Sequence, residues 1–244
     1  MKTTLLIVKL SALLTLLFLC IKLVPKDLFQ TKESIVSLMV DITDSSLAKP
    51  DPVSVMEQFN LLQSKFNGAT FRMTSLSDVS VNPISQLVLR PASILLSNEI
   101  SRDKEVKDFT DSVSKSISDA ESNAKGRSNS SIYFPIVKEL TQLSEITANS
   151  KTLIVYSDLM ENSSELSFYG INKSILLNEP VEKLTARFLE MSPLPDLSNM
   201  VVYFIYQPEN PEEDAAYKKI SQVYQAMLSQ KGALVHIQAN LIKN

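Results

Sequence analysis

Short apolar runs alternate along this chain with longer stretches in which apolar residues recur every three or four positions. Uncharged runs of β-branched and aliphatic residues are typical of strands that are buried on both faces of a parallel sheet. The 3.6-residue periodicity is typical of helices that bury one side. Repeated alternation of the two patterns predicts an α/β domain with three layers, in which helices cover both faces of a mostly parallel sheet.

The pattern also gives the approximate bounds of the elements. The predicted strands cover residues 34–40, 69–76, 151–156, 200–206 and 233–238, with an antiparallel edge strand at 86–90. The predicted helices cover residues 53–66, 102–124, 132–146, 181–191 and 212–230. Acidic residues just before the last helix are expected to cap its N-terminus rather than to bind a ligand.

The N-terminal segment has a different pattern. Residues 5–24 are predominantly apolar, and roughly 20 such residues span a bilayer. We therefore predict a signal anchor or transmembrane segment at 1–24, a linker at 25–33 and a single α/β domain at 34–244. We expect the N-terminus in the cytoplasm and the domain outside it. The alternative is a signal peptide that is cleaved to release a secreted protein.

Composition excludes several classes of function. The net charge of −3 gives no basic face, so nucleic acid is not an expected partner. With only four glycines, the chain has no phosphate-binding loop of the P-loop or Rossmann type. The single cysteine, Cys20, excludes an internal disulfide and a cysteine-based zinc site. What remains is an α/β domain without a nucleotide-binding signature.

Oxygen-bearing side chains follow two of the predicted buried strands. Asp41, Thr43 and Ser45 come after the first, and their alternation lets them converge on one point. Asp158 ends the strand at 151–156. Ligands bind at the carboxyl ends of strands in open α/β sheets, and neighbouring carboxylates repel each other unless a cation or a proton lies between them. We therefore predict a site for Mg²⁺, Mn²⁺ or Ca²⁺, with simple N-capping of the next helix as the alternative.

This combination resembles the von Willebrand factor type A family, whose metal-ion-dependent adhesion site carries a D-x-S-x-S motif after the first strand. Asp41, Thr43 and Ser45 match that motif, with Thr43 in place of the first serine. The resemblance covers about residues 34–240 in the order of the elements, although only a few residues carry it.

The family's other ligands come from later loops. Its second aspartate corresponds to Asp158, although Leu159 stands where the family has glycine. Its threonine from an intervening loop corresponds to Ser131 or the neighbouring Ser130. The resemblance thus implies that Asp41, Thr43, Ser45, Ser131 and Asp158 surround a divalent cation with one open position. A carboxylate from a protein partner would fill that position.

The resemblance implies a metal-dependent protein-binding module that acts in adhesion or in the assembly of an envelope complex, and the predicted anchor would hold it at a membrane, outside the cytoplasm. A binding module is favoured over an enzyme. One alternative is a metal-free structural component of a membrane-associated apparatus. Another is a Mg²⁺-dependent phosphoryl hydrolase that uses Asp41 with Asp44, Asp158 and Glu161. For Glu161 the pattern predicts a polar loop, 161–167, overhanging the same edge.

Overall fold

A mixed sheet organises the part of the chain that the computed structural model describes, residues 30–41, 49–76, 84–122 and 131–242. Its strands are β1 (Glu33–Asp41), β2 (Gly68–Leu76), β3 (Ile84–Leu89), β4 (Ser150–Tyr156), β5 (Met200–Ile205) and β6 (Leu234–Gln238). The order of these six strands is β3-β2-β1-β4-β5-β6, and β3 alone among them runs antiparallel to its neighbour. The predicted mostly parallel sheet and its antiparallel edge strand are confirmed.

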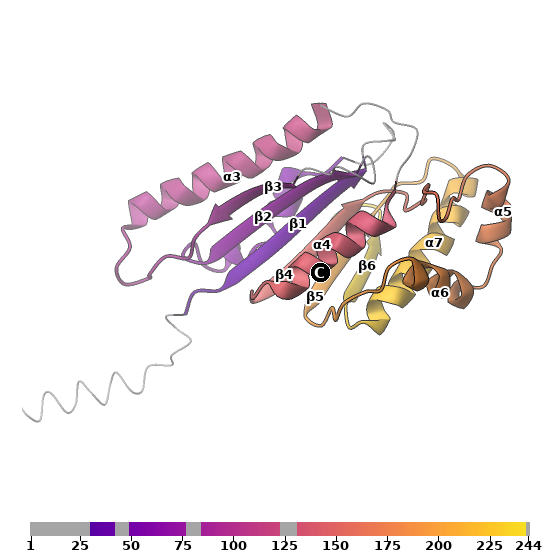
Figure 1. The fold of residues 1–244 in the computed structure, drawn as a ribbon. Coiled ribbons are helices and arrows are strands. Elements are labelled where there is room, and N and C mark those ends of the chain that lie inside the picture. The colour runs from indigo at the N-terminus through magenta and orange to yellow at the C-terminus, as the bar shows by residue number, and fades with distance from the viewer. Residues whose placement is uncertain (1–29, 42–48, 77–83, 123–130, 243–244) are drawn as a thin grey trace, which may run out of the picture.

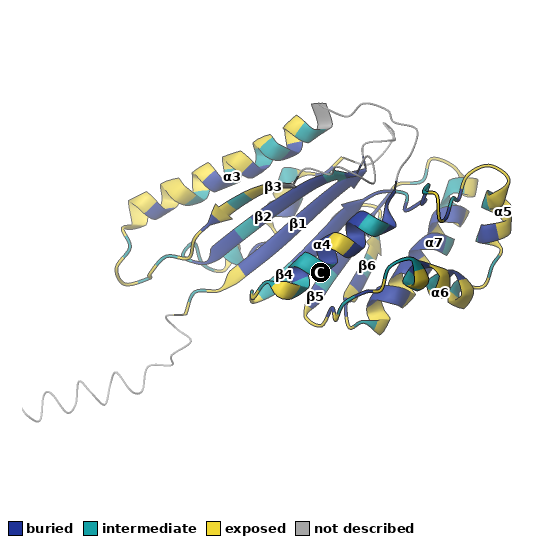
Figure 2. Ribbon diagram, in the orientation of Figure 1, coloured by how far each residue is buried: buried dark blue, intermediate teal, exposed yellow. Residues whose placement is uncertain are grey.

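Helices cover both faces of this sheet (Figure 1). The helical segments in the described ranges are α2 (Pro52–Met56), the 3₁₀ turn η2 (Asn60–Leu62), α3 (Glu99–Ser122), α4 (Tyr133–Glu145), α5 (Asn172–Leu177), α6 (Val181–Met191) and α7 (Pro211–Gln230). One apolar cluster joins the sheet to α4, α6 and α7, and a second joins the opposite face to α2 and α3. The four inner strands, β2, β1, β4 and β5, are predominantly buried, whereas the edge strands β3 and β6 are largely exposed or half-buried (Figure 2).

The predicted helix at 53–66 is wrong beyond its first turn. The helix α2 ends at Met56, and Phe59 is extended with φ of −81° and ψ of 153°. In this conformation the Phe59 ring is fully buried and meets the Phe109 ring of α3 edge-on, with the centroids 5.6 Å apart. Helical spacing of apolar residues indicated a continuous helix, but packing against α3 stabilises a break.

The start of α7 follows from local capping. Asn210 is the N-cap, and its Oδ1 accepts a hydrogen bond from the backbone N–H of Glu213 at 3.0 Å. Glu213 reaches back, accepting from the Asn210 side chain at 2.7 Å and from the backbone N–H of Glu209 at 2.8 Å. Pro211 occupies the first helical position, where a missing N–H costs nothing. The acidic residues here cap the helix, as predicted.

A buried ion pair fastens α4 to the centre of the sheet. Arg72 of β2 donates from Nε to Glu139 Oε1 at 2.6 Å and from Nη2 to Oε2 at 3.0 Å. The two side chains are 9% and 3% exposed. Ser37 of β1 donates to the same carboxylate at 2.8 Å, and Arg72 also donates to Gln86 and Gln142. Because both charges are matched and hydrogen-bonded, the pair can be buried without a large net penalty.

We expect Glu139→Gln to lower the free energy of unfolding by about 3–5 kcal/mol, because it leaves the Arg72 guanidinium buried without a counter-charge. Urea denaturation followed by circular dichroism measures this loss. The matched control is Asp108→Asn, which breaks the exposed pair between Lys104 and Asp108 and should cost about 0–1 kcal/mol. Equal losses for the two variants would contradict a stabilising role for the buried pair.

Candidate functional site

The carboxyl ends of β1 and β4 lie side by side. The two strands pair in parallel, with Val40 opposite Tyr156. One residue further, Ser157 donates a hydrogen bond from Oγ to Asp41 Oδ2 at 3.2 Å. Asp41 is only 4% exposed and Ser157 is fully buried. The carboxylate at the end of the central strand is therefore held against the end of its neighbour, immediately before Asp158.

Asp158 begins a tight turn. Its Oδ1 accepts a hydrogen bond from the backbone N–H of Met160 at 2.9 Å, and its side chain is partly exposed. Between these two residues, Leu159 has φ of 62° and a fully buried side chain. This left-handed conformation is costly for a bulky residue and ordinary for glycine. Leu159 thus adopts the backbone conformation that glycine favours, and burial of its side chain compensates for the strain.

The predicted loop at 161–167 lies between β4 and α5, but Glu161, its first residue, does not overhang the edge as predicted, because it is buried at the N-terminus of α4. Its Oε2 accepts hydrogen bonds from the backbone N–H groups of Ile132 and Tyr133, each at 2.7 Å. Ser131 donates to its Oε1 at 3.2 Å. Burial raises the pKa of Glu161 above its ordinary value, and the hydrogen bonds from Tyr133 and Ile132 oppose this rise. The carboxylate therefore serves as a helix cap supplied from a distant loop.

The structure brings some of the predicted ligands together and not others. Asp41 and Asp158 come from adjacent strand ends, whereas Ser131 is engaged by Glu161. Thr43 and Ser45, like the alternative candidates Asp44 and Ser130, lie outside the described residues. Within the described ranges, no group of three or more His, Cys, Asp or Glu side chains is arranged to hold a metal ion. The predicted site combines two carboxylates with hydroxyl groups. The absence of a group of three such side chains therefore does not exclude it.

A cavity of about 210 Å³ opens beside Asp158 and is also lined by Lys173 of α5 and by Tyr206 and Tyr217. Tyr217 is buried, and its hydroxyl has no hydrogen-bond partner among the described residues. Burial raises the pKa of Tyr217, and the charge of Asp158 adds to this effect. The cavity is smaller than the roughly 300–1,000 Å³ typical of small-molecule sites.

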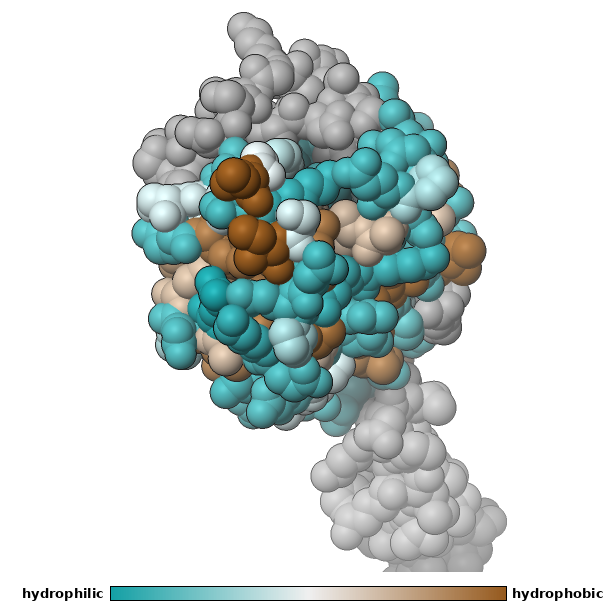
Figure 3. All heavy atoms as spheres, turned by 90° about the vertical axis from the view of Figure 1, so that its right-hand side faces the viewer, coloured by the Kyte–Doolittle hydropathy of each residue, from teal (hydrophilic) through white to brown (hydrophobic). Residues whose placement is uncertain are grey.

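A second, more open hollow of about 580 Å³ adjoins this cavity between α5 and α7. Ile171, at its rim, is 87% exposed, and Ile175 of α5 is 59% exposed. Figure 3 views the molecule from the side on which α5 and α7 lie, and shows a group of strongly hydrophobic residues, with smaller hydrophobic spots elsewhere on a largely hydrophilic surface. The surface next to Asp158 is therefore concave and partly apolar.

The fold and the geometry of its carboxyl edge define this chain as an α/β protein with polar side chains at the carboxyl ends of two adjacent central strands. No profile of a known protein family matches the chain, and no curated protein is significantly similar to it. Among the described residues, no helix is long and apolar enough to cross a membrane. The anchor predicted at 1–24 lies outside those residues.

We expect Glu161→Ala to lower the free energy of unfolding by about 2–4 kcal/mol, because two backbone N–H groups of α4 lose their acceptor in a buried place and each costs about 1–3 kcal/mol. Glu161→Gln keeps an acceptor oxygen in the same position and should cost less. Urea denaturation at pH 8 measures both. An alanine variant as stable as the glutamine variant would show that the cap contributes little.

The raised pKa of Glu161 predicts a pH dependence. The folded protein binds this proton more tightly than the unfolded chain does, so the group lowers stability as pH rises from its ordinary pKa of 4.5 through its folded value. Acidification from pH 8 to pH 5 should therefore stabilise the wild type more than Glu161→Gln. Parallel stability curves for the two proteins would contradict this prediction.

Proposed function

We propose that this chain is a membrane-anchored protein-binding module similar to von Willebrand factor type A domains, with a divalent cation at the carboxyl edge of its sheet. The observation that carries the proposal is the hydrogen bond that holds Asp41 against Ser157, immediately before Asp158. Two aspartates that are distant in the sequence thereby belong to adjacent strand ends, which a shared cation requires.

The donor set suits a hard cation. The Asp41 carboxylate, the hydroxyls of Thr43 and Ser45, and Asp158 are all oxygen ligands, which Mg²⁺, Mn²⁺ and Ca²⁺ prefer. Neutral hydroxyl ligands leave much of the cation's charge uncompensated, so an acidic side chain of a protein partner is the favoured incoming ligand. We assign Ser131 to the support of α4 rather than to the cation, because its hydroxyl already donates to Glu161.

The surroundings of Asp158 support protein binding. The cavity beside it and the adjoining hollow offer room for side chains next to the proposed cation. The N-terminal segment, residues 1–24, would hold the domain at a membrane and outside the cytoplasm. Adhesion and assembly of an envelope complex both fit this arrangement.

A metal-free structural component of a membrane-associated apparatus is the second candidate. The engagement of Ser131 by Glu161 favours it, because the loop before α4 then offers one hydroxyl fewer for a cation. The phosphoryl hydrolase is not proposed, since Glu161, one of its acid–base groups, is buried and caps α4.

We expect the full chain in detergent to bind one Mn²⁺ ion at this edge, and Asp41→Asn to weaken that binding at least tenfold, because it removes a charged ligand but retains the shape of the side chain. Titration calorimetry measures the affinity. The control is Asp111→Asn, which changes an exposed residue of α3 and should leave the affinity unchanged. Equal binding by the wild type and Asp41→Asn, or no binding by either, would favour the metal-free candidate.

The open position of the cation has its own test. Water bound to Mn²⁺ relaxes the protons of the solvent, and a carboxylate that replaces this water reduces the effect. We expect acetate to lower the relaxation of the Mn²⁺-loaded wild type, since acetate imitates an acidic side chain. If acetate has no effect on a protein that binds Mn²⁺, the cation is structural and does not receive a partner.

A further inference from the structure

Three large apolar side chains are exposed at the amino edge of the sheet, opposite the proposed cation site. Leu95 and Leu96 lie in the loop between β3 and α3 and are 72% and 89% exposed. Ile100, in the first turn of α3, is 81% exposed. Single exposed apolar residues are ordinary on protein surfaces, but three within six positions form a local patch that favours contact with another apolar surface.

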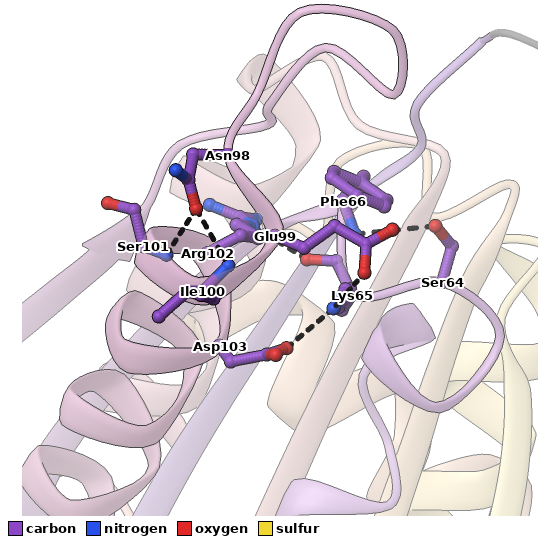
Figure 4. Close-up of polar contacts among 9 residues, drawn as sticks. All are labelled: Ser64, Lys65, Phe66, Asn98, Glu99, Ile100, Ser101, Arg102 and Asp103. Atoms are coloured by element: carbon purple, nitrogen blue, oxygen red, sulfur yellow. Dashed lines mark hydrogen bonds and ion pairs between the residues drawn. The ribbon is translucent and has the colours of Figure 1, made fainter.

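The patch is held in place by a buried arginine. Arg102, from the first turn of α3, is 2% exposed and donates to the backbone carbonyls of Lys65, Arg90 and Asn67 at 2.7, 2.9 and 2.6 Å. The neighbouring Lys65 and Asp103 form an ion pair at 2.7 Å (Figure 4). The first turn of α3 is thus fastened to both β-strand connections around it, so its exposed residues have a defined position.

Asn98 completes this arrangement. Its Oδ1 accepts hydrogen bonds from the backbone N–H groups of Ile100 and Ser101 at 2.9 and 3.2 Å, which caps α3 (Figure 4). With the helix start fixed by this cap, Ile100 is presented on the outside of the first turn, near the loop that carries Leu95 and Leu96.

The same edge receives the N-terminal part of the chain. The backbone N–H of Lys32 donates to Asn67 Oδ1 at 2.9 Å, and Gly68 donates to the Lys32 carbonyl at 2.8 Å. Asn67 therefore links the entry of the chain to Arg102, which binds its carbonyl. In Figure 1 the start of β1 and the loop before α3 lie at the same end of the sheet.

The length of the linker limits how far this edge can lie from a membrane. The apolar segment ends at Val24, and residues 25–32 separate it from the first hydrogen bonds of the domain. Eight extended residues span at most about 30 Å. If residues 5–24 cross a bilayer, the patch formed by Leu95, Leu96 and Ile100 is confined to the vicinity of its surface.

We propose that Leu95, Leu96 and Ile100 insert into the surface of the bilayer that holds the N-terminal anchor. This inference rests on the membrane-anchored part of the proposed function but not on the cation. Exposed or partly exposed charges of both signs lie nearby, with Lys65, Arg90 and Lys104 against Glu99, Asp103 and Glu105, and Arg102 is buried. Burial of apolar side chains rather than attraction to anionic lipid therefore drives the contact. Docking by this edge directs the carboxyl edge, with Asp41 and Asp158, away from the membrane.

The absence of tryptophan from the chain makes a direct test possible. The reporter is Leu96→Trp in the full chain, reconstituted into phosphatidylcholine vesicles with bromine on the acyl chains, which quenches tryptophan only at close approach. The matched control is Ile171→Trp, whose side chain is equally exposed but lies near α5 on the opposite edge. Flotation verifies that both proteins are bound to vesicles, and circular dichroism verifies that both are folded.

We expect the Leu96→Trp protein to show blue-shifted emission and at least threefold stronger quenching than the Ile171→Trp protein. Adding Ile100→Asp to the Leu96→Trp protein should reduce the quenching, because a charge opposes insertion. Equal and weak quenching at both positions would overturn the proposal and leave the patch to a protein partner. A protein that does not float with vesicles would overturn it as well, whereas Mn²⁺ binding in detergent would still test the cation site separately.

Discussion

The rest of the structure depends on the position of β1 in the middle of the sheet. Eight of its nine residues are buried, because parallel strands on both sides and helices on both faces leave it no contact with solvent. The pairing of β1 with its neighbours brings the end of β4 beside the end of β1, so Ser157 can donate a hydrogen bond to Asp41. It also brings the entry of the chain at Lys32 beside Asn67. The arrangement of side chains at both the carboxyl edge and the amino edge of the sheet therefore depends on one strand.

Buried acidic groups then fix the segment that carries Asp158. Ser157 bonds Asp41 on the residue before it, and Glu161, three residues after it, caps α4. The helix is in turn bound to the sheet through Glu139, which pairs with Arg72. Each buried acid is offset by specific donors, which is the condition under which such groups are tolerated. Asp158 thus lies in a turn anchored on both sides, and a rigid support of this kind is what a binding site needs.

The sequence pattern was sufficient to predict the layers of the fold and the neighbouring positions of the Asp41 and Asp158 strand ends. The helix at 181–191 and the antiparallel edge strand follow from periodicity and from Pro91. The short helix α5 and the break at Phe59 do not, because packing against other elements decides them. The hydrogen bonds of the buried Glu161 and Glu139 could not be predicted from the sequence either. The donors that they receive from other elements lie 28 to 102 residues away in sequence, so no local pattern identifies these donors.

The environment of Asp41 links the proposed cation to the stability of the fold. A carboxylate that is 4% exposed loses most of its hydration on folding, and the hydrogen bond from Ser157 at 3.2 Å is one of the interactions that offset this loss. A cation that binds the folded chain but not the unfolded one would shift the folding equilibrium toward the folded state by mass action. Binding of a cation at the carboxyl edge would then also stabilise the end of β1. A partner carboxylate that completes the coordination would stabilise the same strand on which the position of the amino edge depends.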